Sequence, residues 1–335
     1  MTEVIATTAY LEGPGNLVFR EEKLDAPGPC QISCKTLASI ISPGTELAAW
    51  RGMPPLRPGP IYPRLVGYCN AAEVVSVGRD VTQVSPGDRI LSYASHRTHF
   101  LLDEDDVLLR LNDRMDSVPV ASTYLFHLGY NALLRTSARA GSRVLVIGLG
   151  ALGLTSVAMA DVAGADVRAV SDHPGAAAIA REYGARSVHN RADIEAIRAG
   201  WDGRGADIVI ATTGSWTDWR TAIEVAAPLG TIAVLGFPGR GEEPPSFNPL
   251  DSQFFYDKQL RIEAVGMSPE KRDGQGFLRF NQRDNIRYLS GLISSGRLQP
   301  SAIISGHFEG LRLADAYEAL ASRRSSPITF ALDWQ

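Results

Sequence analysis

Three glycines, Gly148, Gly150 and Gly153, follow an apolar run and have the spacing of a phosphate-binding turn. The first glycine permits a tight turn, the second lets the backbone approach a pyrophosphate, and the third lets the following helix pack close to the strand. The free N–H groups at the start of that helix, at Ala151 and Leu152, would point at the phosphates. The stretch therefore predicts a dinucleotide-binding turn. The alternative is a glycine-rich turn in another kind of α/β protein.

The residues after this turn alternate between strand and helix patterns. Strands are predicted over residues 166–171, 207–214, 230–236 and 259–266, with helices over 151–163, 175–183 and 216–228. Such alternation predicts an α/β fold, a doubly wound parallel sheet with helices on both faces. Ligands of such sheets bind beyond the carboxyl ends of the strands.

The first part of the chain has a different sequence pattern. Eleven of the twenty prolines fall within the first 120 residues, among short alternating strands, which is typical of an irregular antiparallel β domain. After about residue 268 the pattern is mixed, with a helix near 284–295 and a final strand over 327–332. We therefore predict a β-rich substrate domain over 1–124, a cofactor domain over 125–267 and a return to the substrate domain over 268–335.

Length and composition limit the class of protein. With 335 residues, 44% hydrophobic and 21% charged, the chain has the composition of a globular protein of more than one domain. Its net charge of −4 gives no reason to expect nucleic acid or an anionic membrane surface as a partner. No apolar run reaches the ~18 residues of a membrane span, and the N-terminus lacks the pattern of a secretory signal. A cytoplasmic location is predicted.

Several short motifs occur in an order that is found in a known superfamily. Residues 42–46 read Ser-Pro-Gly-Thr-Glu, residues 67–69 Gly-Tyr-Cys, residues 84–89 Val-Ser-Pro-Gly-Asp-Arg and residues 129–133 Gly-Tyr-Asn-Ala-Leu. This order, which covers nearly the whole chain, resembles the medium-chain dehydrogenase/reductase superfamily. The resemblance implies a GroES-like β-rich domain, a Rossmann domain for a nicotinamide cofactor, a small-molecule substrate, and assembly into a homodimer or homotetramer.

The zinc-ligand positions of that superfamily are changed in this chain. The resemblance places Pro43 at the first cysteine, Tyr68 at the histidine, Cys69 at the neighbouring glutamate, and Tyr124 at or near the last cysteine. Proline has no side-chain donor, and a neutral phenol is a poor zinc ligand compared with thiolate or imidazole. Three cysteines in the whole chain are also too few for a structural zinc lobe. We therefore expect a protein without bound metal.

The loss of a Lewis acid restricts the chemistry. Charge that develops on a substrate oxygen must then be stabilised by hydrogen-bond donors or a general acid. The resemblance is to zinc-free members that are commonly reductases of activated double bonds or quinones, where the enolate needs only one or two donors and a proton. Thr45, Tyr68 and Tyr124 stand at the positions of the metal and its proton relay, so they are the predicted catalytic residues. Alternatively, the tyrosines only fill the volume left by the zinc.

Other side chains have weaker claims to a role. Glu46 is expected to hold its turn rather than act in catalysis. An isolated histidine is more often structural than catalytic, and aromatic residues pack in the core at least as often as they line a pocket. The candidates left open on those terms are His96, His99, His127, Trp50, Tyr62 and Tyr93.

The choice of nicotinamide is read at the end of the second strand, where an acidic residue binds the ribose of NAD and repels the extra phosphate of NADP. Here Ser171 takes the usual place of that acid, and Asp172 and His173 follow. A small hydroxyl residue with a basic side chain two positions on resembles the NADP-using branches, and Arg191 would add a second positive contact. Asp172 favours NAD if it turns toward the ribose. By the same resemblance, the remaining cofactor contacts are Thr213, Gly214, Gly236, Phe237 and Pro238.

The leading hypothesis is a zinc-independent, NADPH-dependent reductase of an activated C=C bond or carbonyl in a fairly large apolar molecule. Reductive ring closure in a natural-product pathway is a variant of the same chemistry. A zinc-free dehydrogenase of an alcohol or cyclitol is the second hypothesis, although it needs a base that the sequence does not identify. A nucleotide-binding protein without catalytic activity is the third, because it too would combine an intact cofactor fold with a dismantled metal site.

Overall fold

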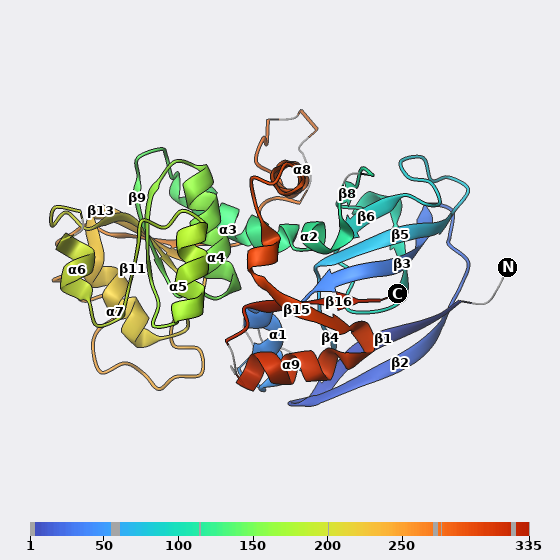
Figure 1. Cartoon of the computed structure of the whole chain (residues 1–335), viewed down its shortest axis with the longest axis horizontal. Helices are drawn as coiled ribbons and strands as arrows, with labels where there is room; N and C mark the ends of the chain where they lie inside the picture. Colours follow the sequence, from blue (N-terminus) through green and yellow to red (C-terminus); the bar gives the residue numbers. More distant parts are fainter. Residues whose placement is uncertain are drawn as a thin grey trace. The chain divides into compact units, whose positions relative to one another are not determined.

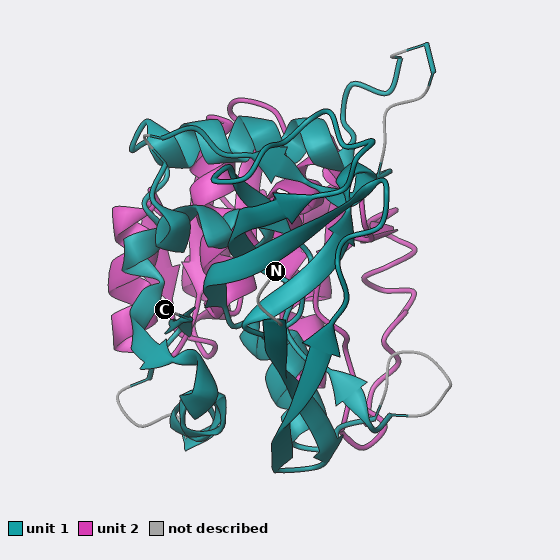
Figure 2. Cartoon of the chain, turned by 90° about the vertical axis from the view of Figure 1, so that its right-hand side faces the viewer, with its two compact units in different colours: residues 1–124, 269–335 teal, residues 125–268 magenta. Residues whose placement is uncertain are grey.

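The structure is a computed structural model of the 335-residue chain. It describes residues 4–54, 61–113, 115–199, 201–270, 274–275, 277–322 and 326–334. The chain forms two compact units, which Figures 1 and 2 show. Unit 1 comprises residues 1–124 and 269–335, and unit 2 comprises residues 125–268.

Unit 2 contains a six-stranded parallel sheet with the strand order β11-β10-β9-β12-β13-β14. The strands are β9 (Arg143–Ile147), β10 (Asp166–Val170), β11 (Ser187–His189), β12 (Ala206–Ala211), β13 (Ala226–Val234) and β14 (Arg261–Ala264). The central strand β9 is apolar from Val144 onward and fully buried there, as expected for a parallel strand with both faces covered. The predicted doubly wound parallel sheet is thus confirmed.

The helices of this unit connect its strands. They are α3 (Thr123–Thr136), which begins at the end of unit 1, α4 (Ala151–Val162), α5 (Pro174–Glu182), α6 (Ile194–Ala199) and α7 (Trp216–Val225). Helix α4 packs on α5 and on strands β9 and β10, while α7 packs on α6 and on strands β12 and β13 (Figure 1). Strand β11 and helix α6 were not predicted, since both are short.

Helix α7 ends at Val225, three residues before the predicted end at residue 228. The chain turns into β13 there, and Ala226 pairs with Ala206 of β12. The ammonium of Lys258 donates to the carbonyl oxygens of Ile223, Glu224 and Ala226 at 3.0, 2.7 and 3.0 Å. Because a single cation satisfies these terminal carbonyls, the helix can end without a glycine.

Unit 1 is rich in antiparallel strands. Its seven-stranded sheet has the order β15-β16-β3-β5-β6-β8, with β7 also paired to β3, and a three-stranded sheet has the order β2-β1-β4. The strands are β1 (Val4–Gly13), β2 (Asn16–Leu24), β3 (Gln31–Ile40), β4 (Arg64–Leu65), β5 (Asn70–Val77), β6 (Arg89–Ser92), β7 (His99–Asp103), β8 (Leu109–Arg110), β15 (Ile304–Glu309) and β16 (Thr329–Asp333).

Four α-helices and three short 3₁₀ helices complete the described part of unit 1. They are α1 (Pro43–Trp50), α2 (Ser117–Ala121), α8 (Gln282–Ser294), α9 (Leu313–Ser322), η1 (Glu104–Asp106), η2 (Pro300–Ala302) and η3 (Gly310–Arg312). The C-terminal segment enters the sheet because β16 pairs with β3. Strand β15 and helix α9 were not predicted. No helix in the described residues has both the length and the apolar character that a membrane span requires.

Candidate active site

The glycine turn of unit 2 is built as tightly as its sequence predicts. Gly148 follows β9 with φ +91, and a Cβ added to it would lie 2.7 Å from the hydroxyl oxygen of Thr212. A Cβ at Gly153 would overlap the carbonyl oxygen of Gly148. Both positions therefore require glycine, one for its backbone conformation and one for the close packing of α4 on the turn.

Gly150 has a different environment from the other two glycines. It is the N-cap of α4, no side chain caps the helix there, and a Cβ added to Gly150 would meet no protein atom within 4 Å. The backbone N–H groups at the start of α4, at Ala151 and Leu152, thus face space that a side chain at Gly150 would fill. A pyrophosphate fits such a cradle, since a helix N-terminus attracts anions.

Two further turns of unit 2 lie against each other at the carboxyl ends of β12 and β13. A Cβ at Gly236 would lie 2.5 Å from the backbone of Thr212, and one at Gly214 would lie 3.2 Å from the carbonyl oxygen of Phe237. The ring of Phe237 is exposed, and Pro238 follows it. The structure therefore brings the predicted residues Thr213, Gly214 and Gly236 together at the same edge of the sheet as the glycine turn.

The end of β10 holds a charge cluster that the sequence did not reveal. Arg191 binds Asp172 at 2.6 Å and Asp218, in the first turn of α7, at 2.7 Å. The backbone N–H of Arg191 also donates to Asp172 at 3.0 Å, and these hydrogen bonds hold the pKa of Asp172 below its ordinary value. Arg191 is thus already paired with two carboxylates. Any contact with a cofactor phosphate would add to those two ion pairs.

Ser171 and His173 are also engaged by the protein. Ser171 is buried, and its hydroxyl oxygen accepts the backbone N–H of His173 at 3.1 Å. His173 is the N-cap of α5. The residues predicted to contact the adenosine end of the cofactor therefore lie together. Asp218 is a further member of this group through its ion pair with Arg191. Asp218 was not predicted from the sequence.

In unit 1, the three residues predicted to be catalytic lie close to one another. The hydroxyl of Tyr68 donates a short hydrogen bond to Ser42 and lies 3.5 Å from the hydroxyl oxygen of Thr45. The rings of Tyr68 and Tyr124 meet edge to face with centroids 5.4 Å apart. Ser42 and Thr45 come from the start of α1, Tyr68 from the loop before β5, and Tyr124 from the first turn of α3.

Two more residues extend this group, which we call the tyrosine cluster: Ser42, Thr45, Tyr68, Tyr93, Tyr124 and Gln282. The ring of Tyr93 lies edge to face with that of Tyr124, with centroids 5.0 Å apart. The side-chain nitrogen of Gln282, the first residue of α8, donates a short hydrogen bond to the hydroxyl of Tyr93. Tyr93 was one of several aromatic candidates in the sequence, and Gln282 carried no signal.

A buried network beneath the cluster fixes its backbone. Glu46 accepts the backbone N–H of Ser42 at 2.6 Å through one carboxylate oxygen. Its other oxygen contacts the imidazole of His96 at 2.8 Å and the hydroxyl of Tyr317 at 2.6 Å. Glu46 is 2% exposed, and these three partners satisfy a carboxylate that would otherwise be costly to bury. Glu46 therefore holds the start of α1, and His96 lies under the site.

Burial affects the three tyrosines unequally. It raises the pKa of Tyr68 above its ordinary range, and that of Tyr93 likewise. It raises the pKa of Tyr124 to about 12, while a hydrogen bond with Tyr93 acts in the opposite direction. All three phenols are neutral at pH 7 and can donate hydrogen bonds, and Tyr124 is the one that loses its proton most readily.

The residues at the metal positions do not fit zinc. Pro43 has no donor atom, and the hydroxyl of Tyr68 is bound to Ser42. Cys69 is buried, and burial together with the nearby Glu46 raises its pKa well above the ordinary value, so it is a neutral thiol rather than a thiolate. In the described ranges, no three histidine, cysteine, aspartate or glutamate side chains gather as a metal-binding group.

The remaining candidates from the sequence lie on α1, on α3, on β7 and in the loop before β4. Trp50 packs on Tyr317 with ring centroids 5.4 Å apart, and the hydroxyl of Tyr62 is bound to the carbonyl oxygen of Ala49. His99 lies on β7, and His127 is fully buried in α3. These side chains pack within the fold.

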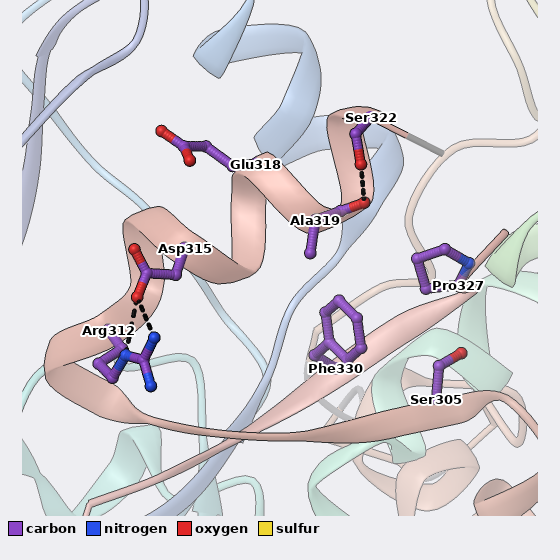
Figure 3. A pocket seen from close by; sticks show the side chains of 8 residues that line it. All are labelled: Ser305, Arg312, Asp315, Glu318, Ala319, Ser322, Pro327 and Phe330. Atoms are coloured by element: carbon purple, nitrogen blue, oxygen red, sulfur yellow. Dashed lines mark hydrogen bonds and ion pairs between the residues drawn. The ribbon is translucent and has the colours of Figure 1, made fainter. Parts of the chain in front are cut away.

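A separate pocket of about 760 Å³ lies on unit 1 between α9 and the strands β15 and β16. Figure 3 shows Phe330 and Pro327 facing Ala319 across it, with Arg312 and Asp315 paired at one end. It shares no lining residue with the tyrosine cluster.

Comparisons with known proteins agree on the family. A family model described as zinc-binding dehydrogenase matches residues 151–281. An NADP-dependent isopropanol dehydrogenase of Entamoeba histolytica is 25% identical, covering 94% of this chain and 91% of that protein. A quinone oxidoreductase of Pseudomonas aeruginosa is 28% identical, covering 99% of this chain and all of that protein. Over nearly its whole length, the chain is therefore similar to proteins of the medium-chain dehydrogenase/reductase superfamily.

The fold of the chain matches solved structures as well. An oxidoreductase of unknown specificity from Escherichia coli superposes with a TM-score of 0.82 at 19% identity, over 98% of this chain and 99% of the other. This likeness shows the fold, while the similarity to the named relatives and to the family model indicates an NAD(P)-dependent oxidoreductase that acts on a small molecule.

Proposed function

We propose that this oxidoreductase is a zinc-independent, NADPH-dependent reductase of an activated C=C bond or carbonyl in a fairly large apolar small molecule. The observation that carries the proposal is the tyrosine cluster, where hydroxyl groups stand at the metal positions. In this proposal unit 1 binds the substrate and unit 2 binds the cofactor through the glycine cradle.

The chemistry follows from the donors that the cluster offers. The nicotinamide, when bound, supplies the hydride that adds to the β-carbon of the substrate. As the π electrons move to the substrate oxygen, the hydroxyl of Thr45 orients that oxygen and shares its charge, and the hydroxyl of Tyr68 does so once its proton turns from Ser42 to the substrate. Tyr124 then gives its proton to the enolate carbon, or to the oxygen of a reduced carbonyl, and water returns the proton to the phenolate.

Support for NADPH comes from two observations. One relative carries NADP dependence in its name. In this chain Arg191 binds the carboxylate of Asp172, which turns that acid toward the guanidinium and reduces its repulsion of a 2′-phosphate. We assign the phosphate contact to Arg191 with Ser171 and His173 beside it.

A homodimer is part of the proposal. Strand β14 ends the sheet of unit 2, and among the described strands none pairs with its outer edge. Its residues Arg261 and Ile262 are exposed. The mass in solution, measured by light scattering, tests this element separately.

The first experiment is a fluorescence titration of chelator-treated protein with NADPH and NADH in parallel. Micromolar binding of NADPH with much weaker NADH is the expected result. A preference for NADH would make Asp172 the ribose ligand and favour an alcohol dehydrogenase. Absence of binding to either would overturn the assignment of the glycine turn.

The second experiment uses enone and ketone acceptors and follows oxidation of NADPH. Tyr124→Phe is expected to lower kcat at least 100-fold and Tyr68→Phe about tenfold, in line with general-acid and hydrogen-bond contributions. Tyr10→Phe, which removes only an exposed hydroxyl at 3.4 Å from Glu22, is the matched control. Tight cofactor binding without turnover of any acceptor would favour a non-catalytic nucleotide binder.

A further inference from the structure

Gln282 is a buried polar residue to which the proposed mechanism gives no role. It is 2% exposed, and its side-chain nitrogen donates to the hydroxyl of Tyr93. Its side-chain oxygen is buried and has no hydrogen-bond partner in the part of the chain that the structure describes. A buried amide oxygen without a partner destabilises a fold. The unpaired side-chain oxygen of Gln282 thus lowers the stability of the fold, while its side-chain nitrogen makes one hydrogen bond, to Tyr93.

The direction of that hydrogen bond determines the next one. An amide nitrogen can only donate, so the hydroxyl oxygen of Tyr93 accepts and its own proton points elsewhere. The side chain of Tyr93 is hydrogen-bonded to Tyr124, and the two rings lie 5.0 Å apart. The proton of Tyr93 is therefore directed to the oxygen of Tyr124.

The backbone around Gln282 is held firmly. Asn281 caps α8 by accepting the backbone N–H of Asp284 at 3.0 Å, and the backbone N–H of Gln282 donates to the carbonyl oxygen of Pro269 at 2.7 Å. The backbone that carries the Gln282 side chain is therefore fixed by its own hydrogen bonds, as that of a residue that orients a neighbour must be.

We propose that Gln282 is a positioning residue that orients the hydroxyl of Tyr93, so that Tyr93 donates to Tyr124 and stabilises the Tyr124 phenolate. The inference rests on the proposed function for the proton transfer by Tyr124. The hydrogen bonds from Gln282 to Tyr93 and from Tyr93 to Tyr124 do not depend on that function.

The groups that face Tyr124 define what else acts on its ionisation. They are the rings of Tyr68 and Tyr93, the thiol of Cys69 and the carboxylate of Glu270. Cys69 is neutral at physiological pH because burial raises its pKa well above the ordinary value. Glu270 is the charged group among these, and its negative charge opposes the phenolate. The hydrogen bond from Tyr93 acts in the opposite direction.

The test replaces the amide with an isosteric group of reversed hydrogen-bond direction. Gln282→Glu presents a carboxylate that accepts the proton of Tyr93 and so withdraws it from Tyr124. The protein is labelled with 3-fluorotyrosine, and the fluorine resonance of Tyr124 is the one that disappears in Tyr124→Phe. The pH titration of this resonance reports the pKa of Tyr124 without any turnover. Gln253→Glu, the same change at an exposed position of unit 2, is the control.

We expect Gln282→Glu to move the Tyr124 titration to higher pH by about one unit, and to lower kcat about tenfold with KM unchanged within about twofold. Gln282→Leu should shift the titration in the same direction without lowering the melting temperature, because it removes the unpaired oxygen. Tyr93→Phe should shift it as well. An unchanged titration in Gln282→Glu would show that the amide accepts from Tyr93 instead, and would overturn the proposal.

The two proposals fail in different ways. If Tyr124→Phe retains full activity while Gln282→Glu still shifts the fluorine titration, the assignment of Tyr124 as proton donor is wrong and the positioning role stands. If Tyr124→Phe loses activity but the titration does not move in Gln282→Glu, the reverse holds.

Discussion

Gly67 lies directly against the imidazole of His96: a Cβ added at Gly67 would be 2.7 Å from three atoms of that ring. The residue also has φ +88, a conformation that side chains with a Cβ rarely adopt. His96 in turn contacts Ser39 and Glu46 at 2.8 Å each. Because Tyr68 follows Gly67 in the chain, the packing of His96 under this glycine sets the backbone that carries the tyrosine.

Replacement of Gly67 by alanine should therefore be costly. We expect Gly67→Ala to lower the free energy of unfolding by about 3 kcal/mol, from backbone strain and overpacking together. Gly291→Ala is the control, since that glycine lies inside α8 with no atom within 4 Å of an added Cβ. It should raise stability by up to about 1 kcal/mol. Urea denaturation measures both, and equal effects would contradict the stated role of His96.

The fold should tolerate a side chain at position 150, whereas cofactor binding should not. Its φ of −77 suits any residue, and an added Cβ meets no protein atom. Gly150→Val is expected to keep the melting temperature within a few degrees while weakening NADPH binding at least 100-fold. Gly291→Val, inside α8 of unit 1 with equally open space, should bind normally. Retained binding in Gly150→Val would place the pyrophosphate elsewhere.

The preference between cofactors should depend on Arg191. Arg191→Leu is expected to weaken NADPH binding about tenfold, the order of a lost charge-assisted contact, and to change NADH binding less than about twofold. Arg186→Leu, which removes an exposed partner of Asp166 at 3.4 Å, is the matched control. If Arg191→Leu weakens both cofactors equally, the arginine supports the strand end without contacting the phosphate.

Stability should fall in mildly acidic solution because of His127. Burial lowers its pKa to about 4 in the folded chain, against an ordinary value near 6.5 in the unfolded chain. Between these values the unfolded state binds the extra proton, so stability is highest above about pH 6.5 and falls as the pH drops toward 4. The loss attributable to His127 is at most about 3 kcal/mol.

His127→Gln should flatten this dependence, as measured by urea unfolding at pH 7.5 and 5. His307→Gln, which removes the half-exposed histidine of β15 beside Asp333, is the control for the loss of a histidine elsewhere in the chain. A slope that is the same in the wild type and His127→Gln would assign the acid sensitivity to other groups.

The parts of the fold that the sequence predicted are those with a local signal. The glycine turn and the apolar strands of unit 2 are encoded within a few residues of each other, since strand periodicity and turn chemistry are short-range properties. Short elements such as β11 and α6 carry too few residues for a periodic pattern. The end of α7 depends on Lys258, which lies more than thirty residues beyond it.

The candidate site shows the same limit more strongly. The proximity of Thr45 and Tyr68 could be anticipated because both belong to motifs of the superfamily. The contact between Tyr93 and Gln282 joins residues 189 positions apart. The pairing of Arg191 with Asp218 joins the segment after β11 to the first turn of α7. Such contacts depend on how elements pack, so no local pattern in the sequence contains them.

The carboxylate of Glu46 is bound by Tyr317, 271 residues later in the chain, and the indole of Trp334 donates to Ser39 at 2.9 Å. During synthesis the ribosome therefore releases all of unit 2 before Tyr317 and Trp334, the C-terminal partners of Glu46 and Ser39, exist. Domains generally fold as they emerge from the ribosome, so unit 2 can fold early. The first 124 residues complete their fold only after residues 269–335 have been made. A nascent chain arrested before residue 313 would bind nucleotide with its catalytic turn still unformed.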